Sequence, residues 1–376
     1  MNKIRYGMVG GAEGAFIGAV HRAAAALDGQ FELVCGAFSQ DPAKGRRTAA
    51  ALGLDPARAY DDLGALLAGE KGRMDALVIV TPNHLHALAA IAALKAGFHV
   101  ISDKPAAMDR AEADSIAVAV KESGKLYALT YTYAGYPLVE EARRRVARGE
   151  FGAIRRIDVM YPQGWLSAPI EQDGQKQAAW RTDPARAGIS CCLADIGVHA
   201  FQLAEHISGQ RVTEISADVS THVPGRRLDD DSSVLLRFAN GARGTLTASQ
   251  ICAGEENGLS IRIYGEKGGL VWTQTEPDSL ILKWPDRPME TLRMGGPGLS
   301  PEALARCRVP AGHPGGYIEA FANHYRAVAG TLAAGRVTSP LGDPLWFPGI
   351  AEGVRSLAFV ETALANSRGA EKWSSL

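Results

Sequence analysis

Lys104, Asp195 and His199 are the side chains of this 376-residue sequence that could together remove a proton and stabilise an oxyanion. Asp195 and His199 stand at positions i and i+4, so a helix would place them on one face. Imidazole accepts a proton readily near neutral pH, which makes His199 the candidate general base. Asp195 would bind a neighbouring hydroxyl or hold His199 and Lys104 in place. The ordinary alternative is that Asp195 caps a helix and His199 only packs within it.

Lys104 follows an apolar stretch that ends in "DKP", at the carboxyl end of a predicted strand. Open α/β sheets bind their ligands at that edge. There an ammonium group would donate a hydrogen bond to the reacting oxygen and favour the alkoxide. Lys104 could instead accept the proton itself if burial favours its neutral form. A lysine that is merely exposed at a strand end is the ordinary alternative.

A glycine-rich loop, "GMVGGAEGAFIGAVH" at residues 7–21, lies between a predicted strand and a predicted helix. This setting is the one that the dinucleotide fingerprint G-x-G-x-x-G requires, because glycine admits phosphates and a helix N-terminus attracts them. The loop is about three residues longer than the standard spacing. Gly10 and Gly11 would make the turn, and Ala12 stands where a strict motif has its second glycine. We expect cofactor contacts from Gly10, Gly11, Ala12, Ala15, Phe16 and Ile17, although a plain structural turn is the alternative.

The end of the second predicted strand bears on the choice of cofactor. In NAD-binding proteins an acidic residue there holds the 2′-hydroxyl of the adenosine ribose. That position falls at Ser39, and a neutral serine with Lys44 nearby suits a 2′-phosphate. Alternatively, Asp41 caps the next helix, and Lys44, Arg46 and Arg47 form its solvated face. The sequence therefore leaves the choice between NAD and NADP open.

Further candidates lie where other predicted strands end. "TPNHLHA" follows a strand rich in valine and isoleucine, and we expect Thr81, Asn83 and His86 to contact the cofactor. Softer candidates for binding substrate hydroxyls are Tyr131, Tyr133 and His313. Aromatic residues near a strand end and a histidine in a glycine-proline loop also have ordinary structural interpretations.

The elements that must position these residues fall into two halves, which predict a domain of residues 1–130 and a second domain of residues 131–376. In the first half, strands separated by helices indicate βαβ crossovers and a doubly wound parallel sheet. Apolar strands show that both faces of this sheet are covered. The predicted strands are 3–9, 31–39, 75–82, 99–105 and 127–131, and the predicted helices are 19–29, 41–53, 85–98 and 111–125.

The second half has strands in succession with few helices between them, which indicates a largely antiparallel open sheet. Asn240–Gly241 between apolar stretches is a strong hairpin signal, and "YGEKGGL" is a second turn of this kind. Residues 285–316, rich in proline and glycine, are expected to form a long loop. The predicted strands are 154–161, 212–223, 232–251, 259–272 and 279–284, and the predicted helices are 194–209, 316–335 and about 350–366.

The composition excludes several classes of protein. A formal net charge of −1 gives no field that would recruit nucleic acid or an anionic membrane. The five cysteines form no C-x-x-C pair, which favours a reducing compartment over a disulfide framework, and we expect no metal site. The adjacent Cys191 and Cys192 are interpreted as small buried hydrophobes. No apolar run is long enough to span a bilayer, so a cytoplasmic enzyme is expected.

Four motifs taken together resemble a known family. The glycine loop ending in "GAVH", then "TPNHLHA", "DKPAA" and "DIGVHAF", are similar in order and spacing to the glucose–fructose oxidoreductase, inositol dehydrogenase and rhizopine-catabolism (Gfo/Idh/MocA) family. The resemblance covers nearly the whole chain. The stretch before and through "DIGVHAF" looks like the branch that acts on sugars, such as levoglucosan-type dehydrogenases.

This resemblance implies an N-terminal Rossmann domain with a bound nicotinamide dinucleotide, and a C-terminal α/β domain whose open sheet often builds an oligomer interface, as in a dimer or tetramer. The family's E-K-P motif would correspond to Asp103-Lys104-Pro105, where the shorter acid leaves a ribose contact open. Its D-x-x-x-H pair would be Asp195 and His199. Trp180 and Arg181 resemble residues that lie by the nicotinamide in some members.

The activity implied is hydride transfer between NAD(P) and a hydroxyl of a sugar, anhydrosugar or polyol. Two alternatives are glycoside cleavage through transient oxidation and a nucleotide-binding sensor without catalysis.

Overall fold

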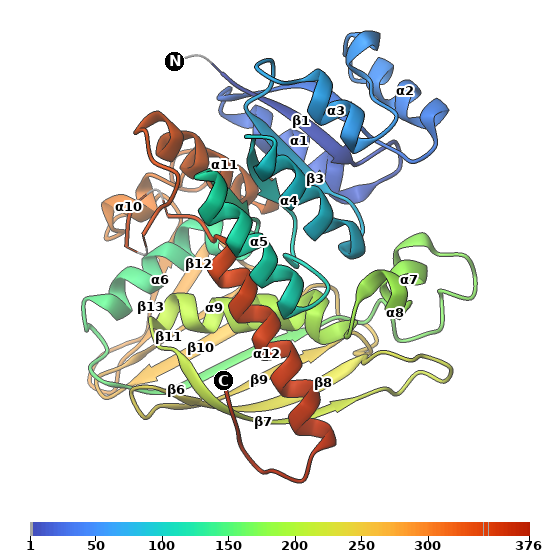
Figure 1. The fold of residues 1–376 in the computed structure, drawn as a ribbon. Helices are drawn as coiled ribbons and strands as arrows, with labels where there is room; N and C mark the ends of the chain where they lie inside the picture. Colours follow the sequence, from blue (N-terminus) through green and yellow to red (C-terminus); the bar gives the residue numbers. More distant parts are fainter. Residues whose placement is uncertain (1–2, 341, 345) are drawn as a thin grey trace. The chain divides into compact units, whose positions relative to one another are not determined.

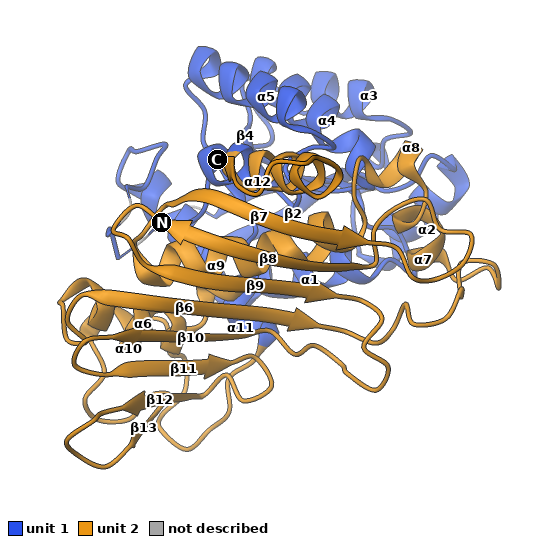
Figure 2. Cartoon of the chain, turned by 90° about the horizontal axis from the view of Figure 1, so that it is seen from below, with its two compact units in different colours: residues 1–132, 317–354 blue, residues 133–316, 355–376 orange. Residues whose placement is uncertain are grey.

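The computed structural model describes residues 3–340, 342–344 and 346–376, and the chain divides into two compact units (Figure 2). Unit 1 comprises residues 1–132 and 317–354, and unit 2 comprises residues 133–316 and 355–376. The predicted division into residues 1–130 and 131–376 does not include the return of residues 317–354 to the first unit.

Unit 1 is built on a five-stranded sheet in the order β2-β1-β3-β4-β5, with every neighbouring pair parallel. Every residue of β3 is buried, because helices cover both faces of such a sheet. Strands and helices alternate along the blue and teal part of Figure 1, which confirms the predicted parallel sheet. The elements are β1 (Ile4–Gly10), α1 (Phe16–Leu27), β2 (Phe31–Ala37), α2 (Pro42–Ala51), α3 (Leu63–Gly69), β3 (Ala76–Val80), α4 (His86–Lys95), β4 (His99–Ser102), α5 (Arg110–Ser123) and β5 (Tyr127–Leu129).

Helix α11 (Tyr317–Ala333) completes unit 1 by packing against α1. The hydroxyl of Tyr325 lies 2.7 Å from Nδ1 of His21, and the ring of Phe321 lies edge-on to His21 at 5.0 Å. Arg326 forms an ion pair with Asp28 at 2.8 Å. Aromatic packing and an ion pair therefore fix the returning helix beside the helix that follows the glycine loop.

Unit 2 is built on a nine-stranded sheet in the order β13-β12-β11-β10-β6-β9-β8-β7-β14. The predicted hairpins at Asn240–Gly241 and at 264–270 are confirmed, since β8 pairs antiparallel with β9 and β10 with β11. The central pair β6–β9 is parallel, which the sequence did not predict. The strands are β6 (Ile154–Pro162), β7 (Val212–Ser220), β8 (Asp231–Phe238), β9 (Arg243–Ser249), β10 (Ser260–Gly265), β11 (Gly269–Thr273), β12 (Ser279–Lys283), β13 (Glu290–Arg293) and β14 (Ser374–Ser375).

The parallel pair follows from the long connection after β6. That connection contains α7 (Lys176–Arg181), α8 (Pro184–Ala187) and α9 (Val198–Ser208), and only a connection of such length can return a chain to the same strand direction. The later β7–β8–β9 meander then runs β9 alongside β6. The sheet is therefore mixed at its centre and antiparallel elsewhere.

Helices cover one face of the unit 2 sheet. Figure 2 shows α6 (Pro137–Ala147) and α9 behind the strands, whose near face carries no helix. On that bare face Leu235 is 48% exposed and Met160 is 38% exposed.

The prediction of a long loop at 285–316 is partly wrong, because edge strand β13 and short helix α10 (Pro301–Leu304) form within it. An edge strand tolerates neighbouring prolines. Helix α12 (Ile350–Arg368) precedes the C-terminal strand, and no helix of the described residues is long and apolar enough to cross a bilayer.

Candidate active site

The glycine loop brings β1, β3 and α1 into close backbone contact. Gly10 and Gly11 have φ angles of +82° and +73°, which side chains rarely adopt. A Cβ on Gly10 would lie 2.8 Å from the carbonyl oxygen of Val80, and a Cβ on Gly18 would lie 2.5 Å from Cα of Gly11. Gly18, in the first turn of α1, therefore permits the close helix–strand packing that the third glycine of the fingerprint provides.

The N-terminus of α1 suits a phosphate. Its N-cap is Ala15, no side chain within the described residues caps it, and no acidic residue lies in its first turn. Its amide N–H groups and the positive end of its dipole are thus open to an anion. Ala12 is buried and Phe16 is 65% exposed, while Ile17 packs against the core of unit 1. This cradle of glycine backbone and uncapped helix fits the pyrophosphate of a dinucleotide.

The loops that follow β3 and β4 are tied together by His86. Its Nδ1 lies 2.7 Å from the carbonyl oxygen of Pro105, and its Nε2 lies 2.8 Å from that of Thr81. Asn83 is buried in the same turn. His86 thus fixes the backbone on either side of the ligand edge, and direct contacts of Thr81, Asn83 and His86 with a cofactor stay predictions.

Asp103 is turned toward the interior of unit 1. Its Oδ1 accepts a hydrogen bond from Oγ1 of Thr130 at 3.1 Å and lies 3.8 Å from Nε2 of His21. Burial alone would raise the pKa of this carboxyl, but His21 and the charge of Lys104 outweigh it and lower the pKa below the usual value. Asp103 therefore remains ionised beside Lys104.

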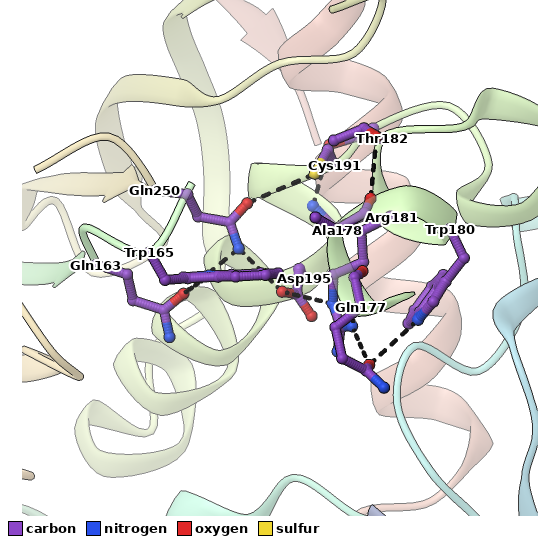
Figure 3. A network of polar contacts seen from close by, with 12 residues as sticks. Gln163, Trp165, Gln177, Ala178, Trp180, Arg181, Thr182, Cys191, Asp195 and Gln250 are labelled. Atoms are coloured by element: carbon purple, nitrogen blue, oxygen red, sulfur yellow. Dashed lines mark hydrogen bonds and ion pairs between the residues drawn. The ribbon is translucent and has the colours of Figure 1, made fainter. Parts of the chain in front are cut away.

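Asp195 is held by side chains from two other segments of unit 2 (Figure 3). Its Oδ2 accepts hydrogen bonds from Nε of Arg181 at 3.2 Å and from Nε2 of Gln250 at 3.0 Å. The guanidinium of Arg181 lies 4.2 Å from the ring centre of Trp180 and donates to Oε1 of Gln177 at 2.6 Å. Asp195 is therefore a tethered, mostly buried carboxylate.

The helix that carries Asp195 begins with a π-helical turn, Leu193–Gly197, which continues into α9. Asp195 lies inside this turn, so the alternative that it caps the helix is wrong. Such turns have i→i+5 hydrogen bonds and recur at functional sites. The carboxylate of Asp229 accepts the N–H groups of Cys191 at 2.9 Å and Leu193 at 2.7 Å, and thereby holds the start of the helix.

His199, in the first turn of α9, is 7% exposed and lies among aromatic rings. The ring of Tyr133 packs edge-on against it with centres 4.8 Å apart, and the ring centre of Tyr161 lies 6.4 Å away. The hydroxyls of Tyr133 and Tyr161 are hydrogen-bonded to each other. Burial raises the pKa of Tyr133 well above its usual value, so the phenol stays protonated.

A chain of amide side chains runs from these tyrosines to Asp195. Tyr161 and Gln163 both donate to Oδ1 of Asn257, at 3.1 and 2.6 Å. Oε1 of Gln163 accepts from Nε1 of Trp165 at 3.0 Å (Figure 3). Gln250 then reaches both Gln163, at 3.4 Å, and Asp195.

These polar side chains were not predicted from the sequence, although Gln163 directly follows β6 and Gln250 directly follows β9 in the structure. Those two strands are neighbours, because the N–H of Gln163 donates to the carbonyl of Ser249 at 2.7 Å. Polar residues at two strand ends were therefore a usable signal, but only once the strand order was known.

Tyr131 and His313 are the remaining candidates for substrate binding. Tyr131 is buried in unit 1, where its carbonyl oxygen lies 2.9 Å from Nε2 of His324. His313 lies in an exposed loop with its Nδ1 3.1 Å from the carbonyl of Pro310. Their substrate roles stay predictions. Lys104 belongs to unit 1, whereas Asp195 and His199 belong to unit 2.

A glycine cradle on a parallel sheet, together with a second unit that holds a carboxylate in a polar network and a histidine on the same helix, is the arrangement of a dinucleotide-binding oxidoreductase. Residues 4–131 match the model of an oxidoreductase family with an NAD-binding Rossmann fold, and residues 139–271 match the GFO/IDH/MocA C-terminal domain. The chain belongs to this oxidoreductase family, and its first unit is an NAD-binding Rossmann domain.

Individual relatives agree with this assignment. An uncharacterized oxidoreductase, YfiI, of Bacillus subtilis is 32% identical over 98% of this chain and 96% of its own length. The structure of an inositol dehydrogenase homolog from Azotobacter vinelandii, complexed with NADH and myo-inositol, is similar with a TM-score of 0.90 and 33% identity, over 100% of this chain and 98% of that one. A levoglucosan dehydrogenase of Pseudarthrobacter phenanthrenivorans is 31% identical over 54% of this chain and 56% of its own.

Proposed function

We propose that this chain is a dehydrogenase that transfers a hydride between a nicotinamide cofactor and a hydroxyl of a sugar, anhydrosugar or polyol. The observation that carries the proposal is the set of polar side chains around Asp195. Gln163, Gln250 and Arg181 offer amide and guanidinium donors, and Asp195 offers acceptors, within a few ångströms of one another. Groups of this kind pair with vicinal hydroxyls. Relatives named for inositol and levoglucosan support the same substrate class.

The chain's own residues would divide the remaining work. The cofactor, bound by Gly10, Gly11 and the α1 N-terminus, supplies the hydride acceptor. His199 accepts the hydroxyl proton, and the rings of Tyr133 and Tyr161 keep its imidazole in a dry, oriented setting. Asp195 binds an adjacent hydroxyl while Arg181 and Gln250 fix its orientation. Lys104 hydrogen-bonds the reacting oxygen and favours its anionic form.

The test separates cofactor binding from turnover. A panel of sugars, inositols and anhydrosugars is assayed with NAD and NADP separately, by the absorbance of the reduced nicotinamide. His199→Ala should lower kcat about 10²–10⁴-fold with unchanged affinity for NADH. His222→Ala, at an exposed histidine of the same unit, is the matched control and should retain full turnover.

Turnover that survives His199→Ala would disprove the general-base assignment. Cofactor binding without turnover of any compound in the panel would instead favour the alternative of a nucleotide-binding sensor without catalysis. Product formed without release of reduced nicotinamide would favour transient oxidation.

The bare face of the unit 2 sheet supports a further part of the proposal, that the chain forms a homo-oligomer, either a dimer or a tetramer. Leu235 and Met160 expose apolar side chains there, and exposed apolar side chains favour association. All five cysteines are unpaired, which supports a cytoplasmic location for the protein. Light scattering of the purified chain tests the assembly: Leu235→Lys should lower the measured mass, and a monomeric parent chain would refute it.

A further inference from the structure

We propose that the adenosine-ribose end of the cofactor site accepts a 2′-phosphate, so that this chain binds NADP about as well as NAD. The proposal concerns side chains that follow β2 and open α2, all within unit 1. It rests on the Rossmann domain and does not depend on which substrate is oxidised.

The residues after β2 offer a neutral donor where an NAD-selective site has an acid. Phe38 is buried, with its ring over Gly36, so Ser39 is the first partly exposed residue after the strand. Oγ of Ser39 accepts the N–H of Asp41 at 3.1 Å. This hydroxyl keeps its own proton for donation, and a phosphate oxygen is an acceptor of the right kind. A carboxylate in the same place would repel that phosphate.

The nearest acid on α2 is committed elsewhere. Oδ1 of Asp41 accepts the N–H groups of Ala43 at 2.9 Å and Lys44 at 3.3 Å, which is an ordinary helix cap. The predicted capping role of Asp41 is therefore confirmed. One oxygen of this carboxylate, Oδ1, is therefore occupied by the first N–H groups of α2.

Lys44 lies on the edge of α2 that contacts the glycine loop. Oγ1 of Thr48 accepts the N–H of Glu13 at 3.2 Å and donates to the carbonyl of Lys44 at 2.9 Å. Positions i and i+4 share a helix face, so Lys44 is beside the residue that touches the loop. Its side chain is half-buried and has no ion-pair partner in the described part of the chain. Arg47, one turn along the same edge, is exposed and adds a second positive charge.

The charge count on this edge sets the expected selectivity. The positive charges of Lys44 and Arg47 are equal in number to the negative charges of Glu13 and Asp41, so the net charge of these four side chains is zero. Attraction of a phosphate then depends on direct hydrogen bonds from Ser39 and Lys44 more than on the field. We therefore expect affinities for NADH and NADPH that differ by less than about tenfold, and Glu13→Gln should shift the balance toward NADPH.

The experiment uses calorimetry on the full chain with three nucleotide probes. These are 2′,5′-ADP, 3′,5′-ADP and 5′-AMP, which share the adenosine and the 5′-phosphate and differ only in the added phosphate. We expect 2′,5′-ADP to bind at least as tightly as 5′-AMP and more tightly than 3′,5′-ADP. Lys44→Ala should lower the affinity for 2′,5′-ADP about tenfold and leave the affinity for 5′-AMP unchanged. The loss of one hydrogen bond to a charged group lowers an affinity by about this factor.

Two further variants complete the test. Arg46→Ala is the matched control, because Arg46 lies on another side of α2 in an ion pair with Asp61 at 2.7 Å, and it should change neither probe. Ser39→Asp should weaken 2′,5′-ADP more than tenfold and tighten NADH. The proposal is overturned if 2′,5′-ADP binds more than tenfold weaker than 5′-AMP to the parent chain, or if Lys44→Ala weakens both probes equally. Neither outcome depends on turnover, so the proposed substrate class stands or falls separately.

Discussion

Asp229 fixes the position of the turn that carries Asp195, and its removal should disable the site without touching cofactor binding. The two N–H groups that it accepts, from Cys191 and Leu193, belong to the start of a helix and have no partner within that helix. Asp229→Ala leaves both buried and unpaired. At about 1–3 kcal/mol for each such group, the free energy of unfolding should fall by about 2–6 kcal/mol.

Asp229→Asn should be the milder change. Burial raises the pKa of Asp229, and the hydrogen bonds from Leu193 and Cys191 only partly offset it, so the pKa stays above its usual value. A neutral amide removes this desolvation penalty and keeps one acceptor, while its NH₂ group faces the other N–H. We expect a loss of about 1–3 kcal/mol, from one unpaired group.

Urea unfolding measures these losses, and fluorescence titration with NADH measures the state of unit 1. Both variants should bind NADH as the parent does while kcat falls and KM for the substrate rises. Asp218→Ala, at an exposed aspartate on neighbouring strand β7, is the control. A loss below about 1 kcal/mol in Asp229→Ala would refute the reasoning, as would equal losses of NADH affinity and turnover.

Two other outcomes are expected within unit 1. Gly18→Ala places a methyl group 2.5 Å from Cα of Gly11 and should raise the Kd for NADH at least about tenfold. In the control Gly45→Ala, the new Cβ would meet nothing closer than 3.8 Å, so the Kd should be unchanged. Equal effects of the two substitutions would contradict the close-packing argument. Burial, with help from Lys125, lowers the pKa of His99 from 6.5 to about 4, and its Nδ1 accepts the N–H of Leu126 at 3.0 Å. Between these pH values the unfolded chain binds more protons, so the free energy of unfolding should fall by up to about 3 kcal/mol as pH drops from 6.5 to 4. Urea unfolding across this range should show a flatter profile for His99→Asn, and an unchanged slope would exclude His99 as the cause.

Local patterns predicted the elements of this chain well because they depend on neighbours in sequence. The hairpin at Asn240–Gly241 and the cap at Asp41 each need only a few adjacent residues. The parallel pairing of β6 with β9 and the packing of α11 on α1 depend on contacts between distant segments, and no local pattern encodes them. The helix predicted at 316–335 forms at 317–333, but its apolar face does not reveal which sheet it joins.

The same distinction explains what was missed in the site. Gly10 and Gly11 stand at fingerprint positions, so counting found them, whereas Gly18 is required only because its Cα approaches that of Gly11. Asp229 lies 34 positions after Asp195 in the sequence and meets its turn only through the start of β8. The spacing of Asp195 and His199 predicted a shared helix but not its π-helical first turn.

The arrangement of unit 2 separates the residue proposed for proton transfer from the residues proposed to bind substrate hydroxyls. His199 projects from α9 among aromatic rings, while Gln163 and Gln250 project from the ends of β6 and β9 toward Asp195. A substitution at either glutamine alters which donors face a substrate, while the two hydrogen bonds to Asp229 still anchor the helix that carries His199. Substitutions around Asp195 can therefore change which substrate hydroxyl is preferred, while His199 stays in position as the proposed general base. Gln163→Glu and Gln250→Glu should therefore change the ranking of polyols in the panel more than they change kcat for the best one.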